Sequence, residues 1–237
     1  MDEHTLETYY IRYLREIREV KESTVKHYQD AMKYISKFLK DEGKLQSSVF
    51  EISDIESLNL IKEYLYNNEN FMALDKRGHQ MYSAGFNNYF KFASGVEFSK
   101  IRKPIETMDI AMPIVKQKEI ESKSWKRSSI LKDQVIEYAG YNCEIDMNHV
   151  TFTAKSTNHP YMEGHHVLPM RYQEKFSSSL DVYANIICLC PICHRLLHYG
   201  VASEKQFALN KIYAERAHRL ALSGIKISKS DFENLIT

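Results

Sequence analysis

The first 95 residues carry apolar side chains at the spacing of α-helices. Leu6, Tyr10 and Ile17 fall on one face, because an α-helix returns to the same face after three or four residues. A similar stripe runs over residues 25–39, and Ser23 stands where the N-cap of this second helix is expected. Tyrosines and phenylalanines at this spacing predict a packed core rather than a surface on which bases stack.

Two further helices are predicted in this half of the chain. Ser53 and Glu56 form the pattern of a capping box ahead of a third helix, and a fourth helix is expected over residues 80–93. Residues 1–95 are therefore expected to form a helical bundle. Periodicity then fades over residues 96–124, where prolines interrupt and lysines accumulate, so we expect a basic linker there.

Helical spacing returns from Trp125 and ends at Gly140, a residue type that commonly follows the last turn of a helix. Residues 206–237 are expected to form a C-terminal helical extension that packs on the preceding domain or makes a dimer contact. One face of this amphipathic helix would carry Phe207, Ile212, Ala217 and Leu220.

Composition and charge narrow the class of protein. No run of about 18 apolar residues appears, and the acidic start is unlike a secretory signal, so we expect a soluble, cytoplasmic protein without a membrane partner. Disulfides rarely persist in a reducing cytosol, so four cysteines confined to residues 143–193 indicate a metal site. Residues 96–132 carry a net charge of +4, against +1 for the whole chain, which suits either phosphate binding or a solvated linker.

The string EGHHVLPM, followed by NIICLCPICHRLLHYG, resembles the HNH (ββα-metal) family of nucleases. In that family a β-hairpin and a following helix hold one catalytic metal ion. A histidine pair lies on the first strand, an asparagine lies in the loop, and a histidine or asparagine lies on the helix. The residues that match this pattern are His165, His166, Asn185, His194 and His198. The resemblance implies an α+β, mainly α chain with a nuclease domain at residues 125–205 that acts on double-stranded DNA.

The resemblance also assigns roles to these residues. His165 is expected to bind the catalytic ion, Mg²⁺, Mn²⁺ or another transition metal, and His166 to be the general base that activates water. Neighbours on a strand point to opposite faces, which suits this division, and an imidazole titrates at about pH 6.5. His194 and His198 share a helix face, with His194 the stronger ligand candidate and His198 either a ligand or a contact to the scissile phosphate. Asn185 is expected to hold the loop and so orient the base.

A structural zinc site is indicated by the spacing of Cys190 and Cys193, because two such thiolates bind one Zn²⁺ and a structural site takes four protein ligands. Many HNH nucleases supply the other two ligands from an upstream Cys-x-x-Cys. Here Cys143 is followed by Asp146 in the second position, which departs from that pattern. We expect His149 to complete a Cys₃His site. Asp146 is the second choice, because a carboxylate is a harder ligand than zinc usually prefers.

Other residues near this centre are interpreted from their type and position. Cys188 alternates with Cys190 along a predicted strand, so it is either a buried apolar residue or a spare zinc ligand, and we favour burial. Four basic residues are candidates for contacts with DNA phosphates. They are Lys155, Arg171, Lys175 and Arg195.

The same strings resemble in particular the HNH domains of bacterial restriction endonucleases, in which an N-terminal specificity region precedes the nuclease. The resemblance implies that the helical bundle of residues 1–95 serves DNA recognition or dimerisation. One HNH site cuts one strand, so a double-strand break favours a homodimer. Two alternatives remain: a phage, mobile-element or other defence nuclease without restriction specificity, and a non-catalytic zinc-bearing DNA-binding module. His165, His166 and His194 argue against the last, because a binding module needs no base beside a metal ligand.

Overall fold

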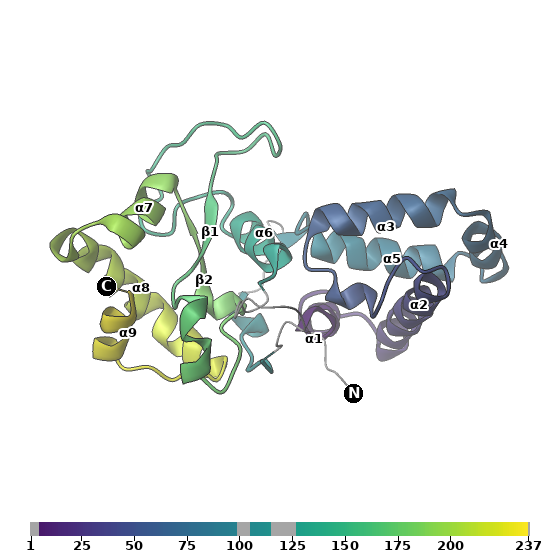
Figure 1. Ribbon diagram of the computed structural model, residues 1–237, viewed down its shortest axis with the longest axis horizontal. Helices are drawn as coiled ribbons and strands as arrows, with labels where there is room; N and C mark the ends of the chain where they lie inside the picture. The colour runs from purple at the N-terminus through teal and green to yellow at the C-terminus, as the bar shows by residue number, and fades with distance from the viewer. Residues whose placement is uncertain (1–4, 99–104, 115–126, 237) are drawn as a thin grey trace. The chain divides into compact units, whose positions relative to one another are not determined.

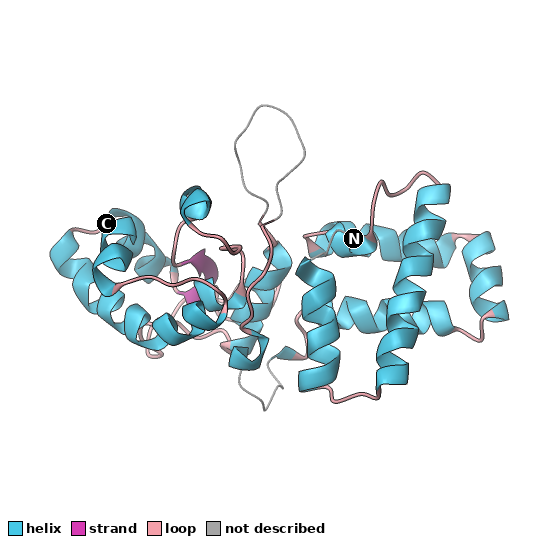
Figure 2. Ribbon diagram, turned by 90° about the horizontal axis from the view of Figure 1, so that it is seen from below, coloured by secondary structure: helices cyan, strands magenta, loops and turns pink. Residues whose placement is uncertain are grey.

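A computed structural model of the chain describes residues 5–98, 105–114 and 127–236. The chain divides into two compact units, residues 1–97 and 98–237. Within the described residues, regular structure is mostly helical and includes one two-stranded sheet, which confirms the α+β, mainly α class (Figures 1 and 2). None of the helices in these residues combines the length and the apolar character needed to cross a membrane.

The described part of the first unit is built from helices. They are α1 (Thr5–Arg12), α2 (Glu22–Asp41), α3 (Ile55–Asn67), α4 (Glu69–Arg77) and α5 (Met81–Ala93), with a π-helical segment at Tyr13–Ile17 and a 3₁₀ turn at Val49–Glu51. α2 packs against α5. The two helices approach closely at Gly85, where a Cβ atom would lie 2.7 Å from that of Ala31, so a larger residue would push them apart.

Aromatic side chains fill the core of the first unit. The ring of Tyr10 lies 5.2 Å from that of Tyr89 and 5.4 Å from that of Phe92, and Phe50 lies 4.9 Å from Tyr89. All four residues are buried. The prediction that these aromatic stripes form a core is confirmed.

Some local predictions for the first unit were wrong. Asp54, not Ser53, caps α3, and its carboxylate accepts a hydrogen bond from a backbone N–H of the first turn. Lys21, not Ser23, is the N-cap residue of α2. The helix α4, which a left-handed turn at residues 79–80 separates from α5, was not predicted.

The second unit surrounds a small β-hairpin. Its elements are α6 (Ser129–Tyr138), β1 (Glu163–His166), β2 (Ile186–Leu189), α7 (Pro191–Tyr199), α8 (Ala202–Leu222) and α9 (Lys229–Ile236), with 3₁₀ turns at Ile105–Met108, Met170–Lys175 and Tyr183–Asn185. The strands are antiparallel, with His165 opposite Ile187. Both α6 and α7 pack on the hairpin, and Figure 1 shows the strands between them.

Part of the predicted linker is packed into the second unit. The buried carboxylate of Asp109 accepts a hydrogen bond from Nε of Arg219 at 2.6 Å, and Met112 O accepts one from Ser179 N at 2.8 Å. Residues 105–114 are thus held by tertiary contacts. The rest of the predicted linker beyond residue 98, residues 99–104 and 115–124, lies outside the described residues.

The predicted core face of α8 is correct in part. Ile212 and Leu220 are buried, as predicted, whereas Phe207 is 70% exposed and Leu209, which was not predicted, is buried. The buried face also includes Arg216 and Arg219, whose charges are paired with carboxylates. A search for apolar spacing treats arginine as a surface residue, so it leaves Arg216 and Arg219 out of the buried face.

Candidate functional site

Three imidazoles from β1 and α7 face one another. His165 comes from the strand, and His194 and His198 come from successive turns of the helix; their ring centroids lie 4.8–4.9 Å apart. A ring nitrogen of each lies within 4.8 Å of the others, and Nε2 of His194 is 3.1 Å from Nε2 of His198. Nitrogen donors that converge in this way fit a divalent transition metal, for which imidazole is a common ligand. We call these residues the histidine triad.

The surroundings of His165 and His198 favour neutral imidazole, which is the form that binds a metal. Burial, followed by the charges of His194 and His198, lowers the pKa of His165 to about 3. Burial and neighbouring positive charges also lower the pKa of His198. His165 and His198 are therefore largely unprotonated near neutral pH, so protons compete little with a metal ion for their ring nitrogens.

A carboxylate fixes the orientation of His194. Glu163 Oε2 is hydrogen-bonded to Nδ1 of His194, and Oε1 accepts a hydrogen bond from the Tyr161 hydroxyl at 3.1 Å. Burial alone would raise the pKa of Glu163, but the hydrogen bonds from His194 and Tyr161 outweigh it and lower that pKa. A carboxylate on Nδ1 sets the tautomer and leaves Nε2 for the metal. Glu163 was not predicted as a site residue, although its place two residues before His165 puts both on one face of β1.

The opposite face of β1 lies against α6. A Cβ atom on Gly164 would lie 2.8 Å from that of Lys132, so the strand can approach α6 this closely only with glycine there. His166 is outside the histidine triad, and its Nε2 lies 2.7 Å from Oδ1 of Asp181. The other oxygen of Asp181 accepts the backbone N–H of Ser128 at 2.8 Å, and both members of the His166–Asp181 pair are buried. Asp181 was not among the predicted site residues.

Asn185 is fully buried and contacts the segment between the strands rather than the triad. Its Oδ1 accepts the N–H of Leu168 at 2.7 Å. Its Nδ2 donates to the carbonyl oxygens of Leu168 at 3.0 Å and Leu180 at 2.8 Å. These bonds hold together the two ends of the connection that leads from His166 to β2.

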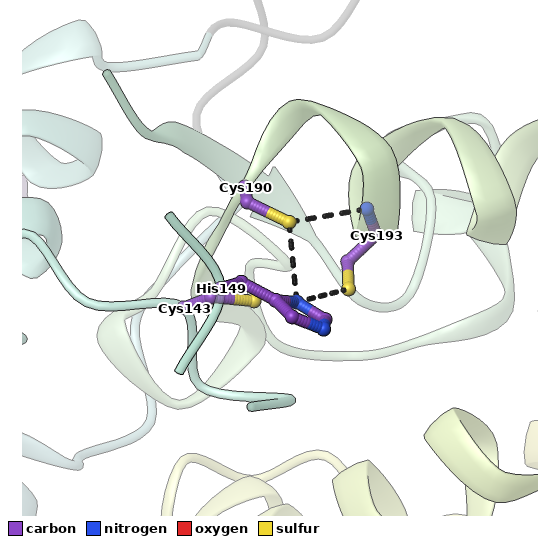
Figure 3. A group of neighbouring side chains, drawn as sticks. All are labelled: Cys143, His149, Cys190 and Cys193. Atoms are coloured by element: carbon purple, nitrogen blue, oxygen red, sulfur yellow. Dashed lines mark hydrogen bonds between the residues drawn. The ribbon is translucent and has the colours of Figure 1, made fainter. Parts of the chain in front are cut away.

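A second cluster lies between α7 and the segment that follows α6. Figure 3 shows Cys143, His149, Cys190 and Cys193 pointing toward one another. Nδ1 of His149 is 3.4 Å from Sγ of Cys190 and 3.3 Å from Sγ of Cys193. A hydrogen bond from Cys193 lowers the pKa of Cys143 to about 4, which stabilises its thiolate. Three sulfur donors and one imidazole nitrogen fit a structural zinc ion, and we call this set the Cys₃His cluster.

The two alternatives for this cluster lie beside it. Asp146 Oδ2 is 3.6 Å from Nε2 of His149, the ring nitrogen that faces away from the sulfurs. Asp146 therefore contacts the imidazole rather than the centre of the cluster. Cys188 is not a member of the cluster; it is buried, and this burial raises the pKa of its thiol, so it remains protonated.

A buried ion pair connects the Cys₃His cluster to α8. Glu144, the neighbour of Cys143, pairs with Arg216, whose side chain is 4% exposed. The other carboxylate oxygen of Glu144 accepts the N–H of Cys188 at 2.6 Å, and Lys211 Nζ donates to the carbonyl of Ile145 at 2.9 Å. The segment that carries Cys143 is thus anchored by α8 and β2.

All four predicted phosphate contacts are exposed side chains of the second unit. Arg171 and Arg195 lie close enough to the triad that their charges help to lower the pKa of His198. Lys175 lies over the ring of Tyr172, 5.0 Å from its centroid, and Lys155 is in the loop before β1. Among the described residues, neither lysine has a contact with the triad. Arg171 and Arg195 are the two that the structure brings to the site.

The match to a known family covers both clusters. Residues 143–203 match the family described as HNH endonuclease. The chain contains an HNH endonuclease domain. This HNH domain begins at Cys143 and extends past His198, so the Cys₃His cluster and the histidine triad both lie inside it.

A relative supports the restriction-like branch of the family that the sequence predicted. The chain is 34% identical over 99 residues to the type IV methyl-directed restriction enzyme EcoKMcrA of Escherichia coli strain K12. The alignment covers 42% of this chain and 30% of that enzyme. The chain thus matches less than a third of its relative's length. The predicted resemblance to HNH nucleases of the restriction type is confirmed.

Proposed function

We propose that this chain is a metal-dependent DNA endonuclease that hydrolyses phosphodiester bonds and acts in restriction. The observation that carries this proposal is the histidine triad, which an HNH domain places beside a Cys₃His cluster. Three converging imidazoles with a neighbouring imidazole–carboxylate pair provide both a metal site and a base, the two parts that hydrolysis of a phosphate ester needs.

His165, His194 and His198 would hold the catalytic divalent ion, and their three imidazole nitrogens suit Mn²⁺ or another transition metal better than Mg²⁺. When bound, such an ion neutralises negative charge that develops on the phosphate. Glu163 keeps Nε2 of His194 directed toward the triad. Arg171 and Arg195 would bind neighbouring phosphates, which fixes the position of the strand.

His166 would act as the general base. Asp181 occupies Nε2 of this imidazole at 2.7 Å, so the proton that His166 takes from water would go to Nδ1. A carboxylate on one ring nitrogen also stabilises the imidazolium that forms. Asn185, which ties together the segment after β1, would keep the His166 backbone in place.

The Cys₃His cluster would hold a structural zinc ion. Cys190 and Cys193 belong to the start of α7, the helix that carries His194 and His198. Cys143 and His149 come from the segment that α8 anchors through Arg216. Zinc would therefore fix the position of α7 relative to the hairpin, and with it the geometry of the triad.

The proposed partner is double-stranded DNA, and a homodimer would place two sites on the two strands. The helical first unit would supply recognition of sequence or base modification. The name of the relative describes it as methyl-directed. Whether this chain also requires modified bases is tested by digesting modified and unmodified genomic DNA and mapping the ends.

The deciding experiment is a plasmid-nicking assay with Mg²⁺ or Mn²⁺ that compares the wild type with His166→Ala. We expect the wild type to nick and the variant to lose at least about a hundredfold in rate, the usual contribution of a general base. His218→Ala, which removes an exposed histidine of α8, is the matched control and should nick normally. Cutting by His166→Ala at the wild-type rate contradicts the assignment of the base. Absence of cutting by the wild type on modified and unmodified DNA favours the zinc-bearing binding module instead.

A further inference from the structure

Lys205 has a covered side-chain stem, and the described residues give its ammonium group no partner. It lies in α8 and is only 4% exposed. Within the described part of the chain, its ammonium group has neither a hydrogen bond nor an ion pair. Arg216 and Arg219, the other buried cations of the same helix, each pair with a carboxylate. Buried lysines are rare unless they are paired, because removing a charge from water costs free energy.

The position within the helix adds to this cost. Lys205 is the fourth residue of α8, close to the N-terminal end, where the helix dipole is positive and disfavours a cation. No described residue offsets that effect through a contact with its ammonium group. The ammonium group of Lys205 therefore has no counter-charge among the described residues and is available to an anion.

The small exposed part of Lys205 includes its charged end. Nζ of Lys205 is not among the described polar atoms that are both unpaired and inaccessible to solvent. This nitrogen therefore reaches the surface, while the stem of the side chain is covered. Lys205 also lies near the histidine triad: its positive charge is one of those, after burial and His194, that lower the pKa of His198. α7 and α8 pack against each other, which brings the two residues together.

We propose that Lys205 is a further catalytic residue of the HNH domain, whose ammonium binds a non-bridging oxygen of the phosphate under attack. This inference rests on the proposed nuclease function. Arg171 and Arg195 are exposed and can follow the DNA backbone, whereas Lys205 is held by the protein before substrate arrives. A donor that is already in position stabilises charge developing in the transition state without reorganising.

The test compares Lys205→Met, which keeps the length of the stem and removes the charge, with the wild type. We expect kcat for plasmid nicking to fall by about a hundredfold, the effect of removing one donor of this kind. The melting temperature should stay the same, because the lost ammonium group reaches solvent and has no hydrogen bond or ion pair among the described residues. Lys205→Arg should recover part of the rate. Lys229→Met, which removes a lysine from α9 whose side chain is 54% exposed, is the control and should change neither quantity.

Two results overturn the inference: nicking by Lys205→Met at the wild-type rate, or a lower melting temperature with an unchanged kcat per folded molecule. If the wild type cuts no DNA, the proposed function fails. The affinity for DNA then tests whether Lys205 binds a phosphate. The dependence of log Kd for a DNA duplex on log salt concentration, measured without added divalent ion, should weaken by about 0.9 in Lys205→Met if one phosphate contact is lost. An unchanged slope shows that Lys205 does not bind phosphate.

Discussion

The hydrogen bond between Glu163 and His194 offers a direct test of how the catalytic ion is held. Glu163→Gln keeps the shape of the side chain but removes the charge that stabilises one tautomer of His194. Loss of a carboxylate behind a metal-ligating histidine typically weakens metal binding by about 10- to 100-fold. The side chains of Glu163 and His194 are each 24% exposed, so water can replace part of the interaction. We therefore expect the lower end, about tenfold, or ~1.4 kcal/mol of binding free energy.

The measurement is a calorimetric titration of the purified protein with Mn²⁺, together with the Mn²⁺ concentration that gives half-maximal nicking. Glu174→Gln removes an exposed carboxylate of the 3₁₀ turn Met170–Lys175 and serves as the matched control. Both measurements should shift together in Glu163→Gln and stay unchanged in Glu174→Gln. Equal Mn²⁺ affinity in Glu163→Gln and the wild type would refute the idea that this carboxylate supports the metal ligand.

Three further outcomes are expected. Cys190→Ser removes one sulfur of the Cys₃His cluster, so the purified variant should lack one equivalent of zinc by elemental analysis and melt at a lower temperature. Arg216→Met leaves Glu144 facing an apolar side chain and should lower the free energy of unfolding in urea by about 3 kcal/mol, whereas adding Glu144→Gln should restore part of it. In the absence of catalytic metal, His165 binds a proton in the unfolded chain below about pH 6.5 but in the folded protein only near pH 3. The free energy of unfolding should therefore fall by up to about 1.4 kcal/mol per pH unit as the pH drops through this window, and His165→Gln should show a smaller slope.

The order of polar residues in the chain was enough to predict the members of both clusters. His194 and His198 share a helix face by their spacing alone, and Cys190 and Cys193 are close for the same reason. Both pairs are close in the sequence, so their spacing alone predicts that their side chains are neighbours. The choice between His149 and Asp146 was harder, because both follow Cys143 at short range and only the turn between them decides which side chain faces the sulfurs.

The residues that support the site were not predicted, and the reason is distance along the chain. Asp181 meets His166 across 15 residues, and Arg216 meets Glu144 across 72. No local pattern identifies such partners, since each depends on how the hairpin and α8 pack. Glu163 is the exception: alternation along β1 puts it on the face of His165, so a strand-by-strand search for carboxylates would have found it.

The pairing of Asp109 with Arg219 determines where the catalytic half can be separated from the rest. A fragment that begins at residue 125, where the helical pattern resumes, would discard Asp109 and leave the guanidinium of Arg219 enclosed without its counter-charge. It would also remove Met112, whose carbonyl receives the N–H of Ser179. A fragment that contains the catalytic half alone should therefore begin no later than residue 98, so that the segment from residue 105 to residue 114 is retained.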